Sequence, residues 1–268
     1  LRLRGLIATL WNSFLFFDTY VQKVRDSTFK VQNSLHVLDR WVMARRDQVT
    51  SEVTERLERY DVVGAARLLD EFVIGDFSNW YLRRSRRRFQ KPESAGELAR
   101  AAAVTASVLL RLIELLAPFL PFLSEIIYRE LRQKMALGEE SIHLRTWPIE
   151  RTMAKGHRTN VLIEGMAEVR RLAAAALAER AKAGIKVRQP LQRMMVNTKQ
   201  VPAQELLDVL KDEVNVREVI VDPKLTADVQ LDTHITLELH EEGVVREFIR
   251  NIQEMRRDAG LKPQESVR

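Results

Sequence analysis

The chain has 268 residues, a mass of 31.1 kDa and a formal net charge of +6, from 43 basic and 37 acidic residues. With only ten glycines and eight prolines and 46% apolar residues, the sequence excludes a disordered or collagen-like chain and favours a helical globular fold. Cysteine is absent, which excludes disulfides, thiolate metal sites and a cysteine nucleophile. This absence also fits a reducing cytoplasm. The basic balance permits nucleic-acid binding without demonstrating it.

The first half of the chain reads as long helices joined by short segments. Five helices are predicted there, over residues 10–24, 35–60, 61–89, 97–117 and 122–135. Apolar residues in the second of them recur at steps of three, four or seven, which indicates an amphipathic helix in a bundle. Asn33 and Ser34 are candidate caps for that helix, and Asp61 for the next. Residues 142–148 read as extended. We expect an all-helical bundle over residues 1–150.

The second half, residues 151–268, mixes helices with strands. Predicted helices span residues 160–183, 203–212 and 242–259, and predicted strands span residues 191–198, 215–221 and 235–240. Gly184 and Gly260 follow the first and last of these helices as C-terminal caps. This order of elements predicts a small α+β domain, which we expect to join the bundle near residues 149–157 and to be truncated at its end.

No catalytic constellation is evident in the sequence. The five histidines are scattered without the spacing of metal ligands, and glycine is too sparse for a phosphate-binding loop. The most apolar stretch, Val108–Leu123, holds two charged residues and two prolines, so it does not read as a membrane span. We therefore expect no catalytic residue, no metal and no cofactor in this region, and no membrane partner.

The strongest local signal is an arginine cluster that follows Trp80 and Tyr81. Its members are Arg83, Arg84, Arg86, Arg87 and Arg88. On a helix, Arg83, Arg84 and Arg87 share a face with Trp80. Guanidinium groups match phosphate oxygens and also stack on bases, so the cluster is a candidate nucleic-acid contact. The alternative is that these cations stabilise a helix C-terminus and pair with acidic neighbours.

A second basic segment, Ala183–Leu191, joins a predicted helix to a predicted strand. In an extended segment, Lys186 and Arg188 project to the same side. The segment is therefore a second candidate contact for an anionic partner.

Several motifs resemble the anticodon-binding region of isoleucyl-tRNA synthetases, which are class I aminoacyl-tRNA synthetases. They are Leu38–Val42, Asp76–Tyr81 with the arginine cluster after it, Leu115–Phe122, Ile142–Pro148, Ala183–Leu191 and Val245–Gln253. The bundle motifs are shared with valyl and leucyl relatives, whereas Asn79–Phe89 and Ala183–Leu191 are more specific to the isoleucyl enzymes. The lack of cysteine resembles the bacterial form that is closer to eukaryotic enzymes and has no cysteine zinc site at its end.

The resemblance implies a mainly α fold, with a class I anticodon-binding helical bundle followed by a small α+β domain. It implies a cytoplasmic, monomeric ligase that attaches isoleucine to its tRNA using ATP and Mg. The family's two ATP signatures, His-Ile-Gly-His and Lys-Met-Ser-Lys-Ser, are absent from this sequence. We therefore expect the catalytic nucleotide-binding domain to lie upstream in the same chain, and this region to be inactive alone.

The resemblance also implies roles for individual residues in tRNA binding. Phosphate and stem contacts are assigned to Arg83, Arg84, Arg87 and Arg88. Lys186 and Arg188 are candidates for contact near the anticodon loop, and Trp80 is expected to be mainly structural, packing beneath the arginines. Three alternatives remain: the equivalent region of valyl-tRNA synthetase, a general helical RNA-binding module, and a scaffold that binds partner helices. The mixed strands after Leu191 argue against the valyl enzyme, which more often ends in a coiled coil.

Overall fold

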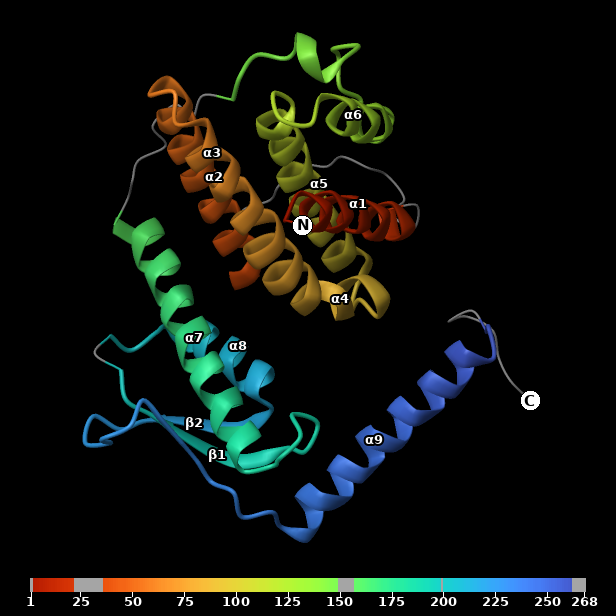
Figure 1. Cartoon of the computed structure of the whole chain (residues 1–268). Helices are drawn as coiled ribbons and strands as arrows, with labels where there is room; N and C mark the ends of the chain where they lie inside the picture. The colour runs from red at the N-terminus through yellow and green to blue at the C-terminus, as the bar shows by residue number, and fades with distance from the viewer. Residues whose placement is uncertain (1, 22–35, 149–156, 199, 262–268) are drawn as a thin grey trace. The chain divides into compact units, whose positions relative to one another are not determined.

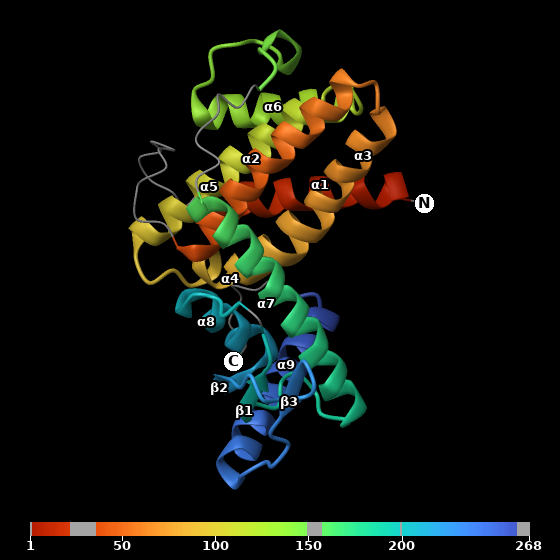
Figure 2. The same ribbon diagram turned by 90° about the vertical axis from the view of Figure 1, so that its left-hand side faces the viewer.

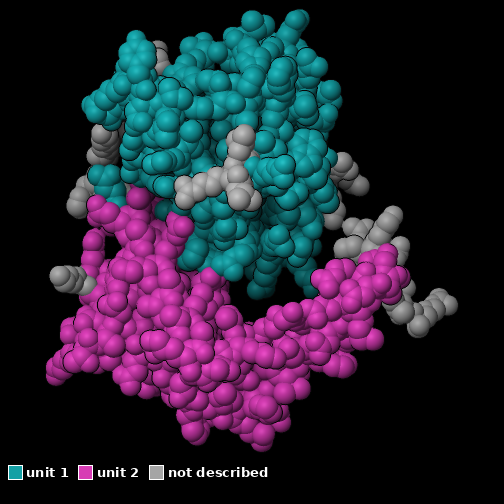
Figure 3. All heavy atoms as spheres, viewed as in Figure 1, with its two compact units in different colours: residues 1–160 teal, residues 161–268 magenta. Residues whose placement is uncertain are grey.

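The computed structural model describes residues 2–21, 36–148, 157–198 and 200–261. The chain divides into two compact units, Leu1–Asn160 and Val161–Arg268 (Figure 3). The boundary predicted from the sequence lies at residue 150, and most of the predicted join at 149–157 lies outside the described residues.

Unit 1 is a bundle of helices (Figure 1). In chain order its elements are α1 (Arg2–Val21), α2 (Val37–Glu58), α3 (Val62–Glu71), η1 (Phe72–Leu82), α4 (Arg83–Gln90), α5 (Ala95–Leu116), α6 (Pro121–Met135) and the short η2 (Ile142–Leu144). α5 contacts α1, α2, α3, α4 and α6, and 14 of its 22 residues are buried. It is therefore the central helix of the bundle, and the predicted all-helical architecture is confirmed for this unit.

The ends of α2 and α3 are set by side-chain caps. His36 caps α2, since its Nδ1 accepts a hydrogen bond from the backbone N–H of Leu38; the predicted caps Asn33 and Ser34 lie outside the described residues. Asp61 caps α3 as predicted, because its carboxylate accepts a hydrogen bond from the backbone N–H of Gly64 at 2.9 Å.

The segment predicted as extended, residues 142–148, begins instead with η2, one turn of 3-10 helix. The reason is local: the hydroxyl of Ser141 accepts a hydrogen bond from the backbone N–H of His143 and caps the turn. The backbone becomes extended at Arg145.

α3, η1 and α4 form one continuous helix whose middle third is a π-helix. The prediction of a single regular helix over residues 61–89 is right about its extent and wrong about this geometry. The π-helical hydrogen bonds reach the carbonyl five residues back, as from the N–H of Arg83 to the carbonyl of Ser78. η1 places Trp80 and Tyr81 in the core, and the arginine cluster begins directly after it.

Unit 2 is a small α+β domain (Figure 2). Its elements are α7 (His157–Lys182), β1 (Leu191–Val196), α8 (Gln204–Val214), β2 (Val216–Val221), β3 (Val229–Leu231) and α9 (Leu237–Asp258). β1 is central in the sheet, parallel to β2 and antiparallel to β3. α7 and α8 lie on one side of the sheet in both views, and a Cβ at Gly165 would lie only 2.7 Å from Cδ1 of Leu206. The predicted order of helices and strands is confirmed.

One predicted element of unit 2 is wrong. Residues 235–240 alternate between apolar and polar, which predicts a strand, yet Leu237 begins α9 and the third strand lies earlier, at Val229–Leu231. Thr236 caps α9 by accepting a hydrogen bond from the backbone N–H of Leu239, and Glu238 places a negative charge in the first turn. At the other helix ends, Gly184 and Gly260 adopt the left-handed φ values of +68° and +71° expected of C-terminal caps.

A buried ion pair ties α2 to α4 in the core of unit 1. The carboxylate of Asp39, which is fully buried, accepts two hydrogen bonds of 2.7 Å from the guanidinium of Arg88. The hydroxyl of Tyr81 donates a third, of 2.9 Å, to the same carboxylate. Glu97 at the start of α5 lies 3.5 Å from Nε of Arg88. The bidentate pair of Arg88 and Asp39 fixes the end of α4 against α2.

The pKa values of two groups in this network are shifted. Burial raises the pKa of the Tyr81 hydroxyl well above its ordinary value, and the negative charge of Asp39 raises it further. Burial on its own would lower the pKa of Arg88, but the hydrogen bonds and charge of Asp39 outweigh it and hold that pKa above its ordinary value. Arg88 is therefore charged and Tyr81 neutral at neutral pH.

We predict that Asp39→Asn destabilises the bundle by about 3–5 kcal/mol, because it leaves the buried guanidinium of Arg88 without its counter-charge. Urea unfolding followed by circular dichroism measures the change. Glu58→Gln, on the exposed end of the same helix, is the control and should cost less than about 0.5 kcal/mol. A cost below about 1 kcal/mol for Asp39→Asn would show that the pair does not hold α4 in place.

The second prediction concerns alkaline pH. In the unfolded chain a tyrosine ionises near pH 10, whereas Tyr81 stays protonated in the folded protein above that pH. The folded state therefore keeps its full stability below about pH 10 as far as Tyr81 is concerned. Above that pH the free energy of unfolding falls by about 1.4 kcal/mol per pH unit, because only the unfolded chain releases the tyrosine proton. Tyr81→Phe should remove this part of the slope between pH 10 and 11, while Tyr60→Phe, at an exposed position, should leave it. Equal slopes in both variants would contradict the buried, neutral tyrosine.

Candidate nucleic-acid interface

The arginines of the cluster lie in three different environments on α4. Arg83, Arg86 and Arg87 are exposed, Arg84 is half-buried, and Arg88 is only 8% exposed. We call the first three the exposed arginine set. Their spacing of three and four residues places them on one side of the helix, where they present an array of guanidinium groups to solvent.

Arg84 lies over the indole ring of Trp80, with its guanidinium carbon 3.5 Å from the ring centroid. The four-residue spacing predicts this contact, and the attraction between a cation and an aromatic face supports it. Trp80 is 7% exposed, so the expected structural role beneath the arginines agrees with its burial. Arg84 is therefore held beside the exposed arginine set in a fixed orientation.

Arg88 does not fit the phosphate contact that the sequence analysis assigns to it. Its guanidinium is directed into the bundle and engages both oxygens of Asp39. A phosphate could reach Arg88 only by breaking a buried ion pair, which is strongly unfavourable. We therefore remove Arg88 from the candidate interface and regard it as the anchor of α4.

α1 also holds α4 in place. The ring of Phe16 packs edge-on against Phe89 at a centroid distance of 5.1 Å, and Tyr20 lies 6.0 Å from the same ring. The guanidinium carbon of Arg86 lies 5.9 Å from the Phe16 ring. The exposed arginine set is thus carried by a short helix that is fastened by an ion pair on one side and by aromatic packing on another.

Lys186 and Arg188 lie in unit 2, between α7 and β1. Residues 186–189 form a turn, in which the N–H of Gln189 donates to the carbonyl of Lys186 at 3.0 Å, so the expected extended conformation is wrong. Both side chains nevertheless reach the same carboxylate, that of Glu247 in α9, at 3.2 Å and 3.0 Å. One hydrogen bond from Lys186, together with one from Arg188, lowers the pKa of Glu247. The two cations therefore lie close together, and the carboxylate of Glu247 in the same chain neutralises part of their charge.

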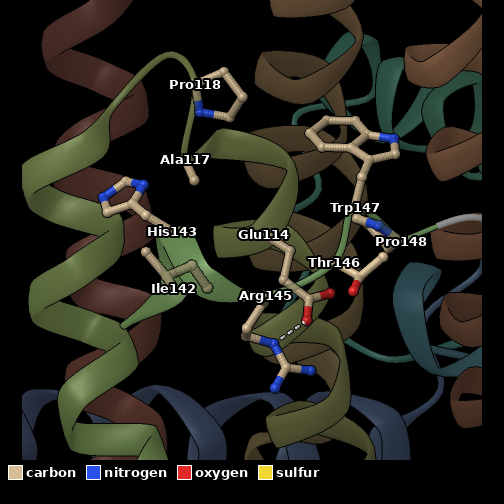
Figure 4. A pocket seen from close by; sticks show the side chains of 9 residues that line it. All are labelled: Glu114, Ala117, Pro118, Ile142, His143, Arg145, Thr146, Trp147 and Pro148. Atoms are coloured by element: carbon tan, nitrogen blue, oxygen red, sulfur yellow. Dashed lines mark hydrogen bonds and ion pairs between the residues drawn. The ribbon is translucent and has the colours of Figure 1, made fainter. Parts of the chain in front are cut away.

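The segment after η2 is tied to the bundle around a pocket of about 220 Å³ (Figure 4). Arg145 donates to Glu114 of α5 at 2.8 Å and to Glu139 at 2.7 Å. The indole N–H of Trp147 donates to the hydroxyl of Thr54 in α2 at 3.0 Å. The charged groups of this pocket are satisfied by one another, so the arrangement serves to close the bundle.

Unit 2 holds a larger hollow, of about 610 Å³, beside α7. It is lined by Glu164, Ala167, Glu168, Arg171, Asn197, Thr198, Gln200 and Asp228. Arg171 pairs with both Glu168 and Asp228, at 2.8 Å and 2.7 Å. Three carboxylates against one arginine give this hollow an acidic character, which repels phosphate groups. It is not part of the candidate interface.

Two kinds of site are not found among the described residues. No group of three or more His, Asp or Glu side chains there is arranged to hold a metal ion. No helix in the described part of the chain is long and apolar enough to cross a membrane.

Sequence reasoning missed two acidic residues that define the interface. Asp39 selects which arginine of the cluster is internal, and Glu247 binds both cations of the turn. Apolar residues flank Asp39 and Arg40 on both sides in α2, so a carboxylate there signals a buried partner. Nothing in the sequence distinguishes Glu247 from other glutamates of α9, because its partners lie about 60 residues earlier.

The comparisons with known proteins identify the family of the chain. The family described as the anticodon-binding domain of tRNA ligase matches residues 39–195, a range that contains every candidate site residue. Isoleucine–tRNA ligase of Thermus thermophilus is 37% identical over 225 residues, which cover 81% of this chain and 21% of that protein. Those of Dehalococcoides mccartyi and Mycobacterium tuberculosis are 32% and 29% identical, over 97% and 99% of this chain and 27% and 31% of theirs.

The chain thus spans between about a fifth and a third of the length of these curated relatives. The family match covers more than half of its residues and includes the helical bundle from α2 onward. The chain belongs to the family of anticodon-binding domains of tRNA ligases, in the form found in isoleucine–tRNA ligases.

Proposed function

We propose that this chain binds the anticodon stem and loop of an isoleucine tRNA on behalf of a longer isoleucine–tRNA ligase. The observation that carries the proposal is the exposed arginine set on α4, whose helix is anchored by the internal pair of Arg88 and Asp39. Family membership supplies the class of partner, and the arginines supply groups that suit its phosphates.

In this proposal the exposed arginine set contacts phosphates of the tRNA backbone. Phosphate contacts fix the position of a nucleic acid but carry no sequence information, which comes from contacts to base edges. Arg84, stacked on Trp80, keeps its guanidinium plane in a fixed orientation beside these contacts. Because α4 is held rigidly, little side-chain and backbone freedom remains to be lost when the tRNA binds.

Lys186 and Arg188 form the second proposed contact, near the anticodon loop. A phosphate that approaches this turn exchanges places with Glu247, which otherwise binds both cations. Unpaired loop bases can be splayed apart and recognised by stacking and by their edges. No covalent chemistry is required of any residue here: binding energy serves to position the tRNA for a reaction elsewhere in the ligase, where isoleucine, ATP and Mg are used.

We predict that Arg83→Ala/Arg87→Ala weakens binding of isoleucine tRNA and reduces the slope of log affinity against log salt by about 2, or about 1 per lost phosphate contact. Fluorescence anisotropy at several salt concentrations measures both quantities. Arg59→Ala/Arg129→Ala, which removes the same charge from exposed positions just after α2 and on α6, is the matched control and should change the slope little. Equal effects of the two double variants would contradict a specific role for α4.

The anticodon itself is tested with a second tRNA that differs only there. We predict that the chain binds isoleucine tRNA more tightly than the same tRNA with a swapped anticodon, because base-edge contacts add to the shared phosphate contacts. Equal, salt-sensitive binding of both tRNAs would leave a general helical RNA-binding module. Absence of binding to either would overturn the proposed function.

A further inference from the structure

A buried arginine lies directly beneath the turn that carries Lys186 and Arg188. Arg180, near the end of α7, is 1% exposed, and no carboxylate among the described residues pairs with it. Burial lowers its pKa to about 10. A buried cation without a counter-charge is costly, so its retention calls for compensation from other polar groups.

Three backbone carbonyls supply that compensation. Nη1 of Arg180 donates to the carbonyls of Lys186, at 3.1 Å, and Gln189, at 2.9 Å. Nη2 donates to the carbonyl of Asn215 at 2.9 Å. The planar, forked guanidinium can satisfy several acceptors in a fixed geometry, which a lysine ammonium cannot do. Arg180 therefore connects both ends of the turn to the loop before β2.

Asn215 completes the support of the turn from the same side. Its side-chain amide donates to the carbonyls of Val187, at 2.8 Å, and Arg188, at 3.2 Å. Arg180 and Asn215 together thus bind the carbonyls of all four residues from 186 to 189. With its carbonyls engaged on the protein side, the turn presents Lys186 and Arg188 where both can reach one carboxylate, that of Glu247.

We propose that Arg180 is a positioning residue for tRNA binding: it fixes the turn of residues 186–189 so that Lys186 and Arg188 act as a pair on one anionic group. This inference rests on the proposed function, and it adds a role for a residue that touches no tRNA itself. The carboxylate of Glu247 occupies the position that a phosphate takes in the complex, since both are compact anions with several acceptor oxygens.

The test is a cycle of variants measured by tRNA affinity over a range of salt. Lys186→Ala/Arg188→Ala should reduce the salt slope by about 2. Arg180→Lys keeps the charge, but its single ammonium nitrogen lacks the planar fork whose two nitrogens reach the three carbonyls, so it should reduce the slope in the same direction. In the Lys186→Ala/Arg188→Ala background it should have no further effect, because the pair through which it acts is gone. Arg193→Lys, on the exposed side of β1, is the charge-matched control and should change nothing.

Asn215→Gly is the second variant, and it keeps the test decisive if Arg180→Lys fails to fold. Asn215 has a φ of +57°, which glycine adopts readily, so the substitution leaves the backbone intact and removes three side-chain hydrogen bonds, two to the turn and one from Arg246 of α9. It should loosen the turn, seen as faster hydrogen exchange at the N–H of Gln189, and reduce the salt slope. Faster exchange with an unchanged slope would overturn the positioning role.

The remaining outcomes separate the two proposals. If the chain binds tRNA but Lys186→Ala/Arg188→Ala leaves affinity and slope unchanged, the positioning role is overturned and the proposed function stands. Arg180→Lys effects that simply add to those of the double variant would also overturn it, since they would reflect general stability. If the unsubstituted chain does not bind tRNA, the proposed function itself fails, and the positioning role fails with it.

Discussion

The ion pair between Asp39 and Arg88 is the constraint on which the candidate interface depends. Two 2.7 Å hydrogen bonds and a third from Tyr81 fasten the end of α4 to α2 inside the bundle. A helix has only one side that can face a given neighbour, so directing Arg88 inward leaves Arg83, Arg86 and Arg87 outside. The cost of burying a charge is thus offset by a counter-charge, and the result is a fixed orientation for its neighbours.

Unit 2 also contains a buried arginine, but its hydrogen-bond partners are of a different kind. Arg180 is buried beneath the turn of residues 186–189 and is compensated by backbone carbonyls instead of a carboxylate. In both units a buried arginine sets the position of more exposed cations nearby. We propose tRNA as the partner of both groups of cations, in line with the family to which the chain belongs. Phosphate binding by fixed cations requires little reorganisation, which favours affinity.

The order of elements and most helix ends follow from apolar periodicity and capping residues such as Asp61 and Gly184, because these signals are local. The predicted start of the first helix is wrong, since α1 begins at Arg2 and not at residue 10. Part of what could not be predicted depends on distant partners. Arg87 and Arg88 are equivalent in sequence, and only Asp39, 49 residues earlier, makes one of them internal. Residues 235–240 alternate like a strand, yet the cap at Thr236 begins a helix there. The π-helix of η1 has no sequence signal that we recognise.

The central claim is that Arg88 is buried while Arg83, Arg86 and Arg87 are exposed and contact tRNA. Arginine-selective modification with phenylglyoxal, followed by mass spectrometry with and without isoleucine tRNA, tests this claim most directly. In the chain alone, Arg83, Arg86 and Arg87 should react rapidly and Arg88 slowly, because its guanidinium is buried and paired. Bound tRNA should protect the first three and leave Arg88 unchanged. Rapid reaction of Arg88, or no protection of the exposed arginines by a tRNA that binds, would contradict the account.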